Sequence, residues 1–174
     1  MPKNLPTFGA IIQGGYFHGV FQIGQELWGE VTAPKASGQI TDKAWLDQYA
    51  DVPGAASDFD GAAVPGATSD FDGAANTQAM LDAGSPLAQA VRALDIDGFT
   101  DWYLPARGGL LMQYSNLKPL LPTDDAFAEK WHWSSTQFSR SYACSQYFDY
   151  GYADYGSKDW AGGFARAVRR FRIE

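Results

Sequence analysis

The chain has 174 residues, of which 45% are hydrophobic and 15% aromatic, and this is enough to build a domain with its own core. Its net charge of −7 at pH 7 opposes general binding to nucleic acids or to anionic membranes. A single cysteine, Cys144, excludes an internal disulfide and a zinc site built from several cysteines.

The first 34 residues predict short strands and tight turns. Apolar stretches at residues 8–12, 20–23 and 27–31 are separated by glycines and end at Pro34, a pattern typical of a β-meander. The start of the chain lacks the apolar stretch of a secretion signal, and no run approaches the roughly 18 apolar residues of a membrane span. We therefore expect no signal peptide and no membrane insertion.

A tandem duplication follows. Residues 52–63 (VPGAASDFDGAA) are repeated at 64–75 (VPGATSDFDGAA), with the single change of Ala56 to Thr68. We interpret residues 52–75 as a loop lengthened by duplication, because doubling a loop costs only about 0.6 kcal/mol in closure entropy. The alternative is a calcium site, for which neither copy carries the further acidic ligands that such loops use. Its candidate ligands are Asp58, Asp60, Asp70 and Asp72.

Helical patterns occupy the middle of the chain. Two helices are expected after Asn76, and the second begins at Ser85, a good N-cap, followed by Pro86 at the first helical position. A short helix is predicted at residues 124–130, where two aspartates suit the positive end of the helix dipole. Another is predicted at residues 106–117, with an apolar stripe of Leu110, Leu111, Tyr114 and Leu117.

The C-terminal part predicts strands at residues 131–135 and 143–148, a loop at 149–163 and a closing strand at 165–173. On the closing strand, Arg169 falls on the apolar face, so we expect it to be paired and partly buried. The alternation gives one apolar face of Ala165, Ala167, Phe171 and Ile173 and one basic face of Arg166, Arg170 and Arg172. With 19 glycines and 9 prolines, these short elements indicate an irregular α+β fold.

Residues 131–160 are rich in tyrosine, serine, glycine and aspartate. This is the composition of an antibody paratope, in which tyrosine provides a large contact area at low entropic cost. We expect Trp131, Trp133 and Phe148 to belong to the scaffold. Irregular spacing does not build a core face, so we expect exposed side chains at Tyr147, Tyr150, Tyr152 and Tyr155.

Several ordered motifs give the chain a resemblance to a known family. Residues 97–107 (DGFTDWYLPAR), 133–137 (WSSTQ) and 166–171 (RAVRRF), with further stretches at 72–80 and 14–35, resemble the DUF1566 domain of phage and bacterial proteins. The resemblance covers most of the chain. It implies a single C-type-lectin-like domain over residues 1–174, with short strands, two or three helices and long irregular loops. Residues 131–173 would be its C-terminal variable region and closing strand, and one copy of the duplication would be extra.

Many members of that family are variable proteins of diversity-generating retroelements, in which a reverse transcriptase mutates adenines and so changes asparagine codons. The resemblance implies a non-enzymatic protein, without cofactor or metal, that binds a protein or cell-surface ligand from a virion tail or a bacterial surface. Adenine changes in AAY codons reach the Arg, Ser, Tyr, Cys and Asp residues of the implied site, but not Trp160. The implied ligand-binding residues are Phe138, Arg140, Ser141, Tyr142, Cys144, Ser145, Tyr147, Asp149, Tyr150, Tyr152, Asp154, Tyr155, Ser157 and Trp160.

Three other functions compete with this one. The lectin-like fold leaves a carbohydrate-binding module as the main alternative. An enzyme would have to use Cys144 with His132, the only conceivable nucleophile and base in the sequence. Nucleic-acid binding would rest on the arginines of the closing strand, against an acidic remainder, so we expect no nucleic-acid partner.

Overall fold

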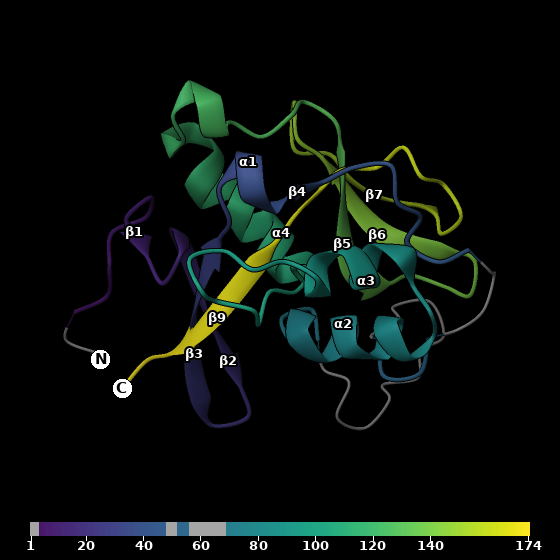
Figure 1. The fold of residues 1–174 in the computed structure, drawn as a ribbon, viewed down its shortest axis with the longest axis horizontal. Helices are drawn as coiled ribbons and strands as arrows, with labels where there is room; N and C mark the ends of the chain where they lie inside the picture. The colour runs from purple at the N-terminus through teal and green to yellow at the C-terminus, as the bar shows by residue number, and fades with distance from the viewer. Residues whose placement is uncertain (1–3, 48–51, 56–68) are drawn as a thin grey trace.

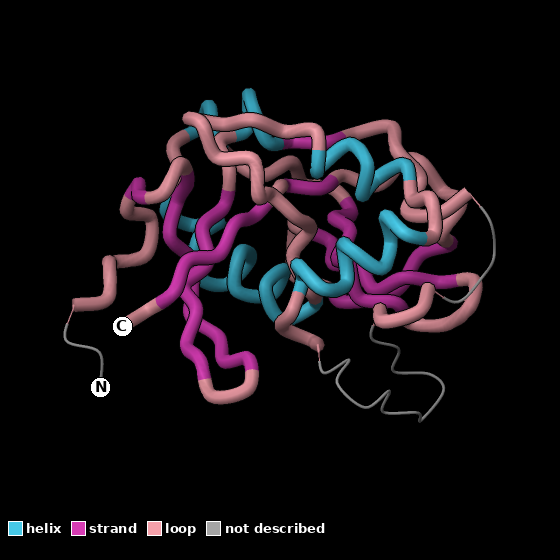
Figure 2. The backbone as a smooth tube through the Cα atoms, turned by 60° about the horizontal axis from the view of Figure 1, so that its bottom comes forward, coloured by secondary structure: helices cyan, strands magenta, loops and turns pink. Residues whose placement is uncertain are grey.

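The computed structural model describes residues 4–47, 52–55 and 69–174, which form an α+β fold of short helices and antiparallel sheets. The largest sheet contains β1 (Ile11–Ile12), β2 (Gly15–Ile23), β3 (Glu26–Thr32) and β9 (Val168–Arg172), in that order (Figure 1). The predicted β-meander is confirmed, although its first strand is shorter and its second longer than expected. β2 and β3 project from the body as a hairpin (Figure 2). All of β9 pairs with β3, which ties the C-terminal segment to the meander.

A three-stranded sheet on the opposite side of the molecule carries the tyrosine-rich segment (Figure 1). Its order is β5 (Trp131–Gln137), β6 (Tyr142–Tyr147) and β7 (Ala153–Ser157). The expectation of a continuous loop at 149–163 is wrong, because β7 forms a hairpin with β6. The chain reverses at Gly151, whose φ of +81° is a conformation that glycine adopts without steric cost. The backbone N–H of Tyr147 then donates to the carbonyl of Tyr152 at 2.8 Å.

The closing strand is split into two parts. β8 (Ala165–Arg166) pairs with β4 (Gln39–Ile40), whereas β9 pairs with β3. Arg169 is partly buried, as predicted, with its guanidinium bound to Asp101 and stacked 4.0 Å from the ring centroid of Phe99. The two halves of the strand therefore connect the large sheet to the region around β5, since a further isolated bridge joins His132 to Phe164.

The helices are short, and the predicted N-cap of α3 is confirmed. α1 (Lys35–Gly38) follows the meander, and α2 (Gly73–Asp82) and α3 (Pro86–Arg92) pack beside each other (Figure 1). α2 begins earlier than expected, because the side chain of Asp72 accepts a hydrogen bond from the Ala75 N–H at 2.9 Å. α3 begins as predicted, with the Ser85 hydroxyl accepting from the Ala88 N–H at 3.1 Å.

The predicted helix at 106–117 forms in two parts, α4 (Arg107–Met112) and a π-helical turn, η1 (Gln113–Leu117). Leu110 and Leu117 are buried as expected, but Leu111 is exposed, so the predicted stripe is wrong at that position. Two glycines occur in the first turn of α4 because the helix approaches its neighbours closely. A Cβ on Gly109 would lie 2.5 Å from Oε1 of Glu30.

The predicted helix at 124–130 does not form, and Arg166, which the strand alternation places on the basic face, is buried; both findings have one cause. The buried guanidinium of Arg166 donates to the carbonyl oxygens of Ala33, Asp125 and Ala126 at 3.2–3.4 Å. Because the carbonyls of residues 125 and 126 accept hydrogen bonds from a side chain, only a 3-10 turn, η3 (Thr123–Asp125), forms at this place. A separate 3-10 turn, η2 (Lys118–Leu120), precedes it in the chain. Burial lowers the pKa of Arg166 to about 10.

A buried polar network holds the helices on the large sheet. The carboxylate of Glu30 in β3 lies 3.0 Å from Nε2 of His18 and accepts a 2.7 Å hydrogen bond from the Tyr103 hydroxyl. Burial, with the neighbouring Glu30, raises the pKa of Tyr103 well above its ordinary value. The hydroxyl of Thr32 links His18 to the side-chain amide of Gln113 in η1. Each buried group therefore has a partner on another element, which fixes α4 and η1 relative to the sheet.

Candidate functional site

The tyrosines of the C-terminal segment are the largest exposed side chains of the three-stranded sheet. Tyr142, Tyr150, Tyr152 and Tyr155 have between 42% and 68% of their surface exposed. This confirms the expectation for the last three, whereas Tyr147 is only partly exposed. Trp133 and Phe148 are fully buried, as expected of scaffold residues, and Trp131 is half-buried against two of the tyrosines.

One group of these rings lies at the start of β6 and consists of Phe138, Tyr142 and Tyr155, here termed the first aromatic cluster. The rings of Phe138 and Tyr155 stack with centroids 4.1 Å apart and planes inclined by 5°. The ring of Tyr142 meets that of Tyr155 edge-on at 5.3 Å. The register of the hairpin produces this contact, because Tyr155 pairs with Cys144, two residues from Tyr142 on the same face of β6.

The second aromatic cluster, Trp131, Tyr147, Tyr150 and Tyr152, lies at the other end of the hairpin. Tyr147 contacts Trp131 at 5.2 Å and Tyr150 at 5.1 Å between ring centroids. Tyr152 lies 6.2 Å from Trp131 and 6.5 Å from Tyr150. Each ring therefore has an aromatic neighbour that limits its motion.

The two clusters are separate surfaces. Tyr142 and Tyr147 are five positions apart in β6, so strand alternation places their side chains on opposite faces of the sheet. At 3.3–3.4 Å per residue, five steps also separate them by about 17 Å along the strand. The predicted site is thus divided into two surfaces that a small ligand cannot contact together.

The remaining predicted residues differ in exposure. Cys144 and Ser145 lie in the central strand β6 and are buried, so each offers a ligand only a small part of its surface. Arg140 and Asp149 are exposed, and Ser141, Asp154 and Ser157 are partly exposed. Trp160 is exposed at the edge of the buried Trp133 ring, 5.9 Å between centroids.

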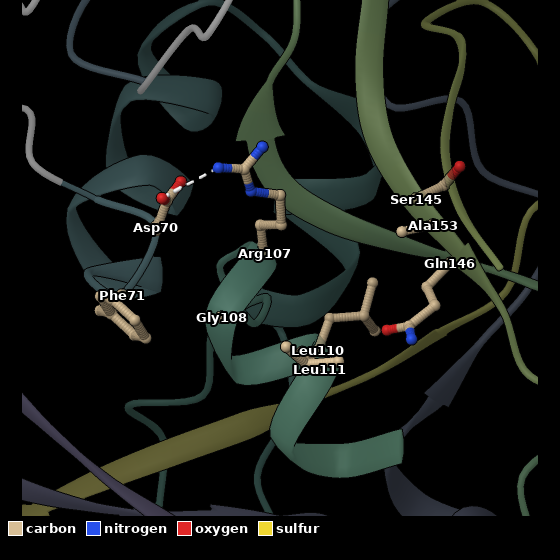
Figure 3. A pocket seen from close by; sticks show the side chains of 9 residues that line it. All are labelled: Asp70, Phe71, Arg107, Gly108, Leu110, Leu111, Ser145, Gln146 and Ala153. Carbon is tan, nitrogen blue, oxygen red and sulfur yellow. Dashed lines mark hydrogen bonds and ion pairs between the residues drawn. The ribbon is translucent and has the colours of Figure 1, made fainter. Parts of the chain in front are cut away.

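Two adjoining hollows lie between α4 and the hairpin, and we call them together the Arg107 groove; Figure 3 shows the larger one. The larger has a volume of about 410 Å³ and the smaller about 220 Å³. They share Arg107, Ser145 and Ala153 as lining residues, and Phe138 and Tyr155 of the first aromatic cluster line the smaller one. The larger hollow is lined by Asp70, Phe71, Arg107, Gly108, Leu110, Leu111, Ser145, Gln146 and Ala153.

The sequence did not identify the part of this groove outside the tyrosine-rich segment. Asp70 and Phe71 belong to the duplicated segment, and Arg107 ends the DGFTDWYLPAR motif at the start of α4. The guanidinium of Arg107 binds the carboxylate of Asp70 at 2.9 Å. The available signal was the apolar Leu111, which the helical pattern assigned to the core.

The acidic residues of the second repeat bind arginines. Asp70 pairs with Arg107, and Asp72 accepts from both Arg170, at 2.9 Å, and the α2 backbone. Among the residues that the structure describes, no group of three or more His, Cys, Asp or Glu side chains is arranged to hold a metal ion. The candidate ligands Asp58 and Asp60 lie outside the described residues.

The competing chemistries also have structural counterparts. His132 is buried and stacks on Phe148 at 4.2 Å, and Gln146, not Cys144, lies opposite it in the sheet. Burial lowers the pKa of His132 to about 4. The arginines of β8 and β9 are engaged with protein groups: Arg166 is buried, and the acidic partners of Arg169, Arg170 and Arg172 are Asp101, Asp72 and Glu26.

No protein family, curated protein or solved structure matches the chain. The resemblance to the DUF1566 domain consequently rests on the sequence motifs alone. Within the described ranges, none of the helices is long and apolar enough to cross a membrane.

Proposed function

We propose that the protein recognises a protein or cell-surface ligand through its exposed tyrosines and has no catalytic activity. The observation that supports this most strongly is the gathering of half-exposed aromatic rings on one hairpin, where each ring contacts another. Large apolar rings are not normally left in water in such groups unless a partner covers them. Tyrosine is also the residue type that, with tryptophan and arginine, contributes most to binding energy at protein interfaces.

The scaffold beneath the hairpin supports this role. A Cβ on Gly156 would lie 2.8 Å from the Trp133 ring, and one on Gly163 would lie 2.3 Å from its Nε1. The two glycines thus allow the hairpin and its following loop to pack directly on a buried tryptophan. Because the rings stand on a packed support, little conformational entropy is lost when a ligand binds.

We further propose a C-type-lectin-like fold and diversification by a retroelement, as the DUF1566 resemblance implies. The arrangement of β6 and β7 is compatible with such variation, since the exposed positions Tyr142 and Tyr155 alternate with the buried Ala143 and with Gly156. Changing the exposed positions alters the surface without disturbing the core. Such a protein would act at a virion tail or a bacterial cell surface.

The proposal is tested with fluorescently labelled protein and a panel of bacterial cells, scored by flow cytometry. Two double variants, Tyr142→Ala with Tyr155→Ala and Tyr150→Ala with Tyr152→Ala, remove one cluster each. We expect at least one of them to lose binding while keeping its circular dichroism spectrum. Arg172→Ala with Glu26→Ala, on the other sheet, is the control and should bind normally. Full binding by both tyrosine variants, or binding to no cell in the panel, would count against the proposal.

A carbohydrate ligand is the second candidate, and the first aromatic cluster is the observation that favours it. Tyr155 is half-exposed and is held nearly parallel to Phe138, which gives a flat apolar platform beside the polar Asp154. Flat aromatic faces suit the apolar face of a sugar ring. Binding to a glycan array that Tyr155→Ala abolishes would select this candidate over a protein ligand.

A further inference from the structure

The walls of the Arg107 groove consist largely of apolar side chains, some of which are exposed to solvent instead of being buried in the core. Leu111 is 53% exposed, and Phe71 is exposed on the opposite side of the larger hollow (Figure 3). The ring of Phe71 rests on bare backbone, since a Cβ on Gly108 would lie 2.3 Å from its Cε1. Leu110 and Ala153 complete the apolar lining. An apolar group placed in this hollow would remove all of these surfaces from water.

The polar atoms of the larger hollow include two hydrogen-bond acceptors. The side-chain N–H of Gln146 donates to the Gly151 carbonyl at 3.1 Å, which leaves its amide oxygen as an acceptor on the side facing Leu110 (Figure 3). The second is the carboxylate of Asp70, which accepts a hydrogen bond from the guanidinium of Arg107 at 2.9 Å. The best-matched occupant therefore carries an N–H or O–H donor.

The size of the groove restricts the occupant further. A volume of about 410 Å³ is at the lower end of the roughly 300–1,000 Å³ typical of ligand pockets. This is room for one large side chain rather than for a folded segment. Apolar walls disfavour a sugar, which presents hydroxyl groups on most sides. The net charge of −7 favours a neutral or basic partner over an acidic one.

We infer that the Arg107 groove receives an aromatic side chain with a donor at its tip, a tryptophan or tyrosine, projecting from a protein partner. This inference rests on the proposed function, because the groove continues directly into the first aromatic cluster through Arg107, Ser145 and Ala153. Phe71, Arg107 and Leu111 lie outside residues 138–160, so this wall of the groove would stay constant while the facing wall, formed by β6 and β7, belongs to the changing surface. The second aromatic cluster is outside this site.

The test uses N-acetyl-L-tryptophanamide as the probe and the ¹⁵N-labelled full chain. The amide chemical shifts are measured as the probe is added up to about 10 mM, a range in which weak fragment binding is detectable. We expect saturable shifts at Gly108, the Gln146 side chain and Ala153. Leu111→Ser should lower the affinity for the probe by about tenfold, because it removes one apolar wall of the hollow. Leu120→Ser is the matched control, since Leu120 is 54% exposed but lies outside both hollows, and it should bind as the unmodified chain does.

The inference is overturned by an absence of shifts, by equal binding in Leu111→Ser, or by methyl glucoside shifting the same amides as strongly as the probe. If Leu111→Ser fails to fold, Ala153→Phe fills the hollow from the exposed strand β7 and should abolish the shifts. Because the probe needs no natural ligand, its result is independent of the cell-binding experiment. If the probe does not bind but a tyrosine variant loses cell binding, the inference about the groove is wrong and the proposed function still holds.

Discussion

Tyr155 and Phe138 stack almost parallel, with ring centroids 4.1 Å apart, although Phe138 follows β5 and Tyr155 lies in β7. The contact bridges the central strand β6 and defines one edge of the Arg107 groove. In the first aromatic cluster, exposed rings contact each other on one face of the sheet, while Trp133 is buried on the opposite face.

Scaffold and surface rings should differ in their effect on stability. Trp133→Ala should lower the free energy of unfolding by about 3–5 kcal/mol, as expected for a fully buried aromatic side chain. Tyr155→Ala should lower it by about 1 kcal/mol or less, because it loses mainly exposed ring contacts. Urea unfolding followed by circular dichroism measures both. Equal losses in the two variants would contradict the division.

The buried His132 predicts an acid-sensitive stability. Its pKa is lowered from 6.5 to about 4 in the folded protein, mainly by burial, so the unfolded chain binds more protons between these values. The contribution of His132 is therefore fully present above pH 6.5 and is lost as the pH falls to 4. At 1.36 kcal/mol per pKa unit, the loss is about 3 kcal/mol.

His132→Phe should make stability less dependent on pH in that window, since phenylalanine suits the neighbouring rings of Phe127, Phe148 and Phe164. Asp125 does not interfere. Its pKa lies below the ordinary 3.8, largely because the Tyr16 hydroxyl donates to it at 2.5 Å, so it titrates under the window. Urea unfolding at pH 7 and pH 4.5 checks the prediction. An unchanged pH dependence in the variant would show that other groups cause it.

The protein should tolerate the loss of one copy of the duplicated segment but not the loss of both copies. At the start of the first copy, Val52 is buried and its N–H binds Gln137 at 2.8 Å; in the second copy, Ser69 accepts from Asn76 of α2. A Cβ on Gly54 would also approach α2, 3.5 Å from Ala79, one turn beyond Asn76. The two anchored parts together contain one complete copy without residues 56–67.

Deletion of residues 56–67 should therefore change the free energy of unfolding by about 1 kcal/mol or less, because the entropy of closing a loop depends only weakly on its length. Deletion of residues 52–75 should prevent folding, because it removes the buried Val52 and the Asp72 cap of α2. Thermal unfolding of the two deletions compares them. A large loss from the shorter deletion would contradict the anchoring described above.

Local chemistry was sufficient for some of these features and insufficient for others. Ser85 with Pro86 predicts the start of α3, and strand alternation predicts that Arg169 needs a partner, because both follow from the local sequence. The identity of that partner, Asp101, does not. The burial of Arg166 depends on carbonyls at 33, 125 and 126, which no local pattern reveals. The Arg107 groove joins residues 70–71, 107–111 and 145–153, so it exists only once the fold has brought them together.

The most direct test of the central claim is the sequence of this gene in sibling isolates, compared position by position with exposure in the structure. We expect substitutions, mostly traceable to adenine changes, at Tyr142, Tyr150, Tyr152 and Tyr155. The buried Trp133 and Ala143 and the groove residues Phe71, Arg107 and Leu111 should stay unchanged. Divergence spread evenly over the chain, or tyrosines that never vary while the core does, would contradict the account.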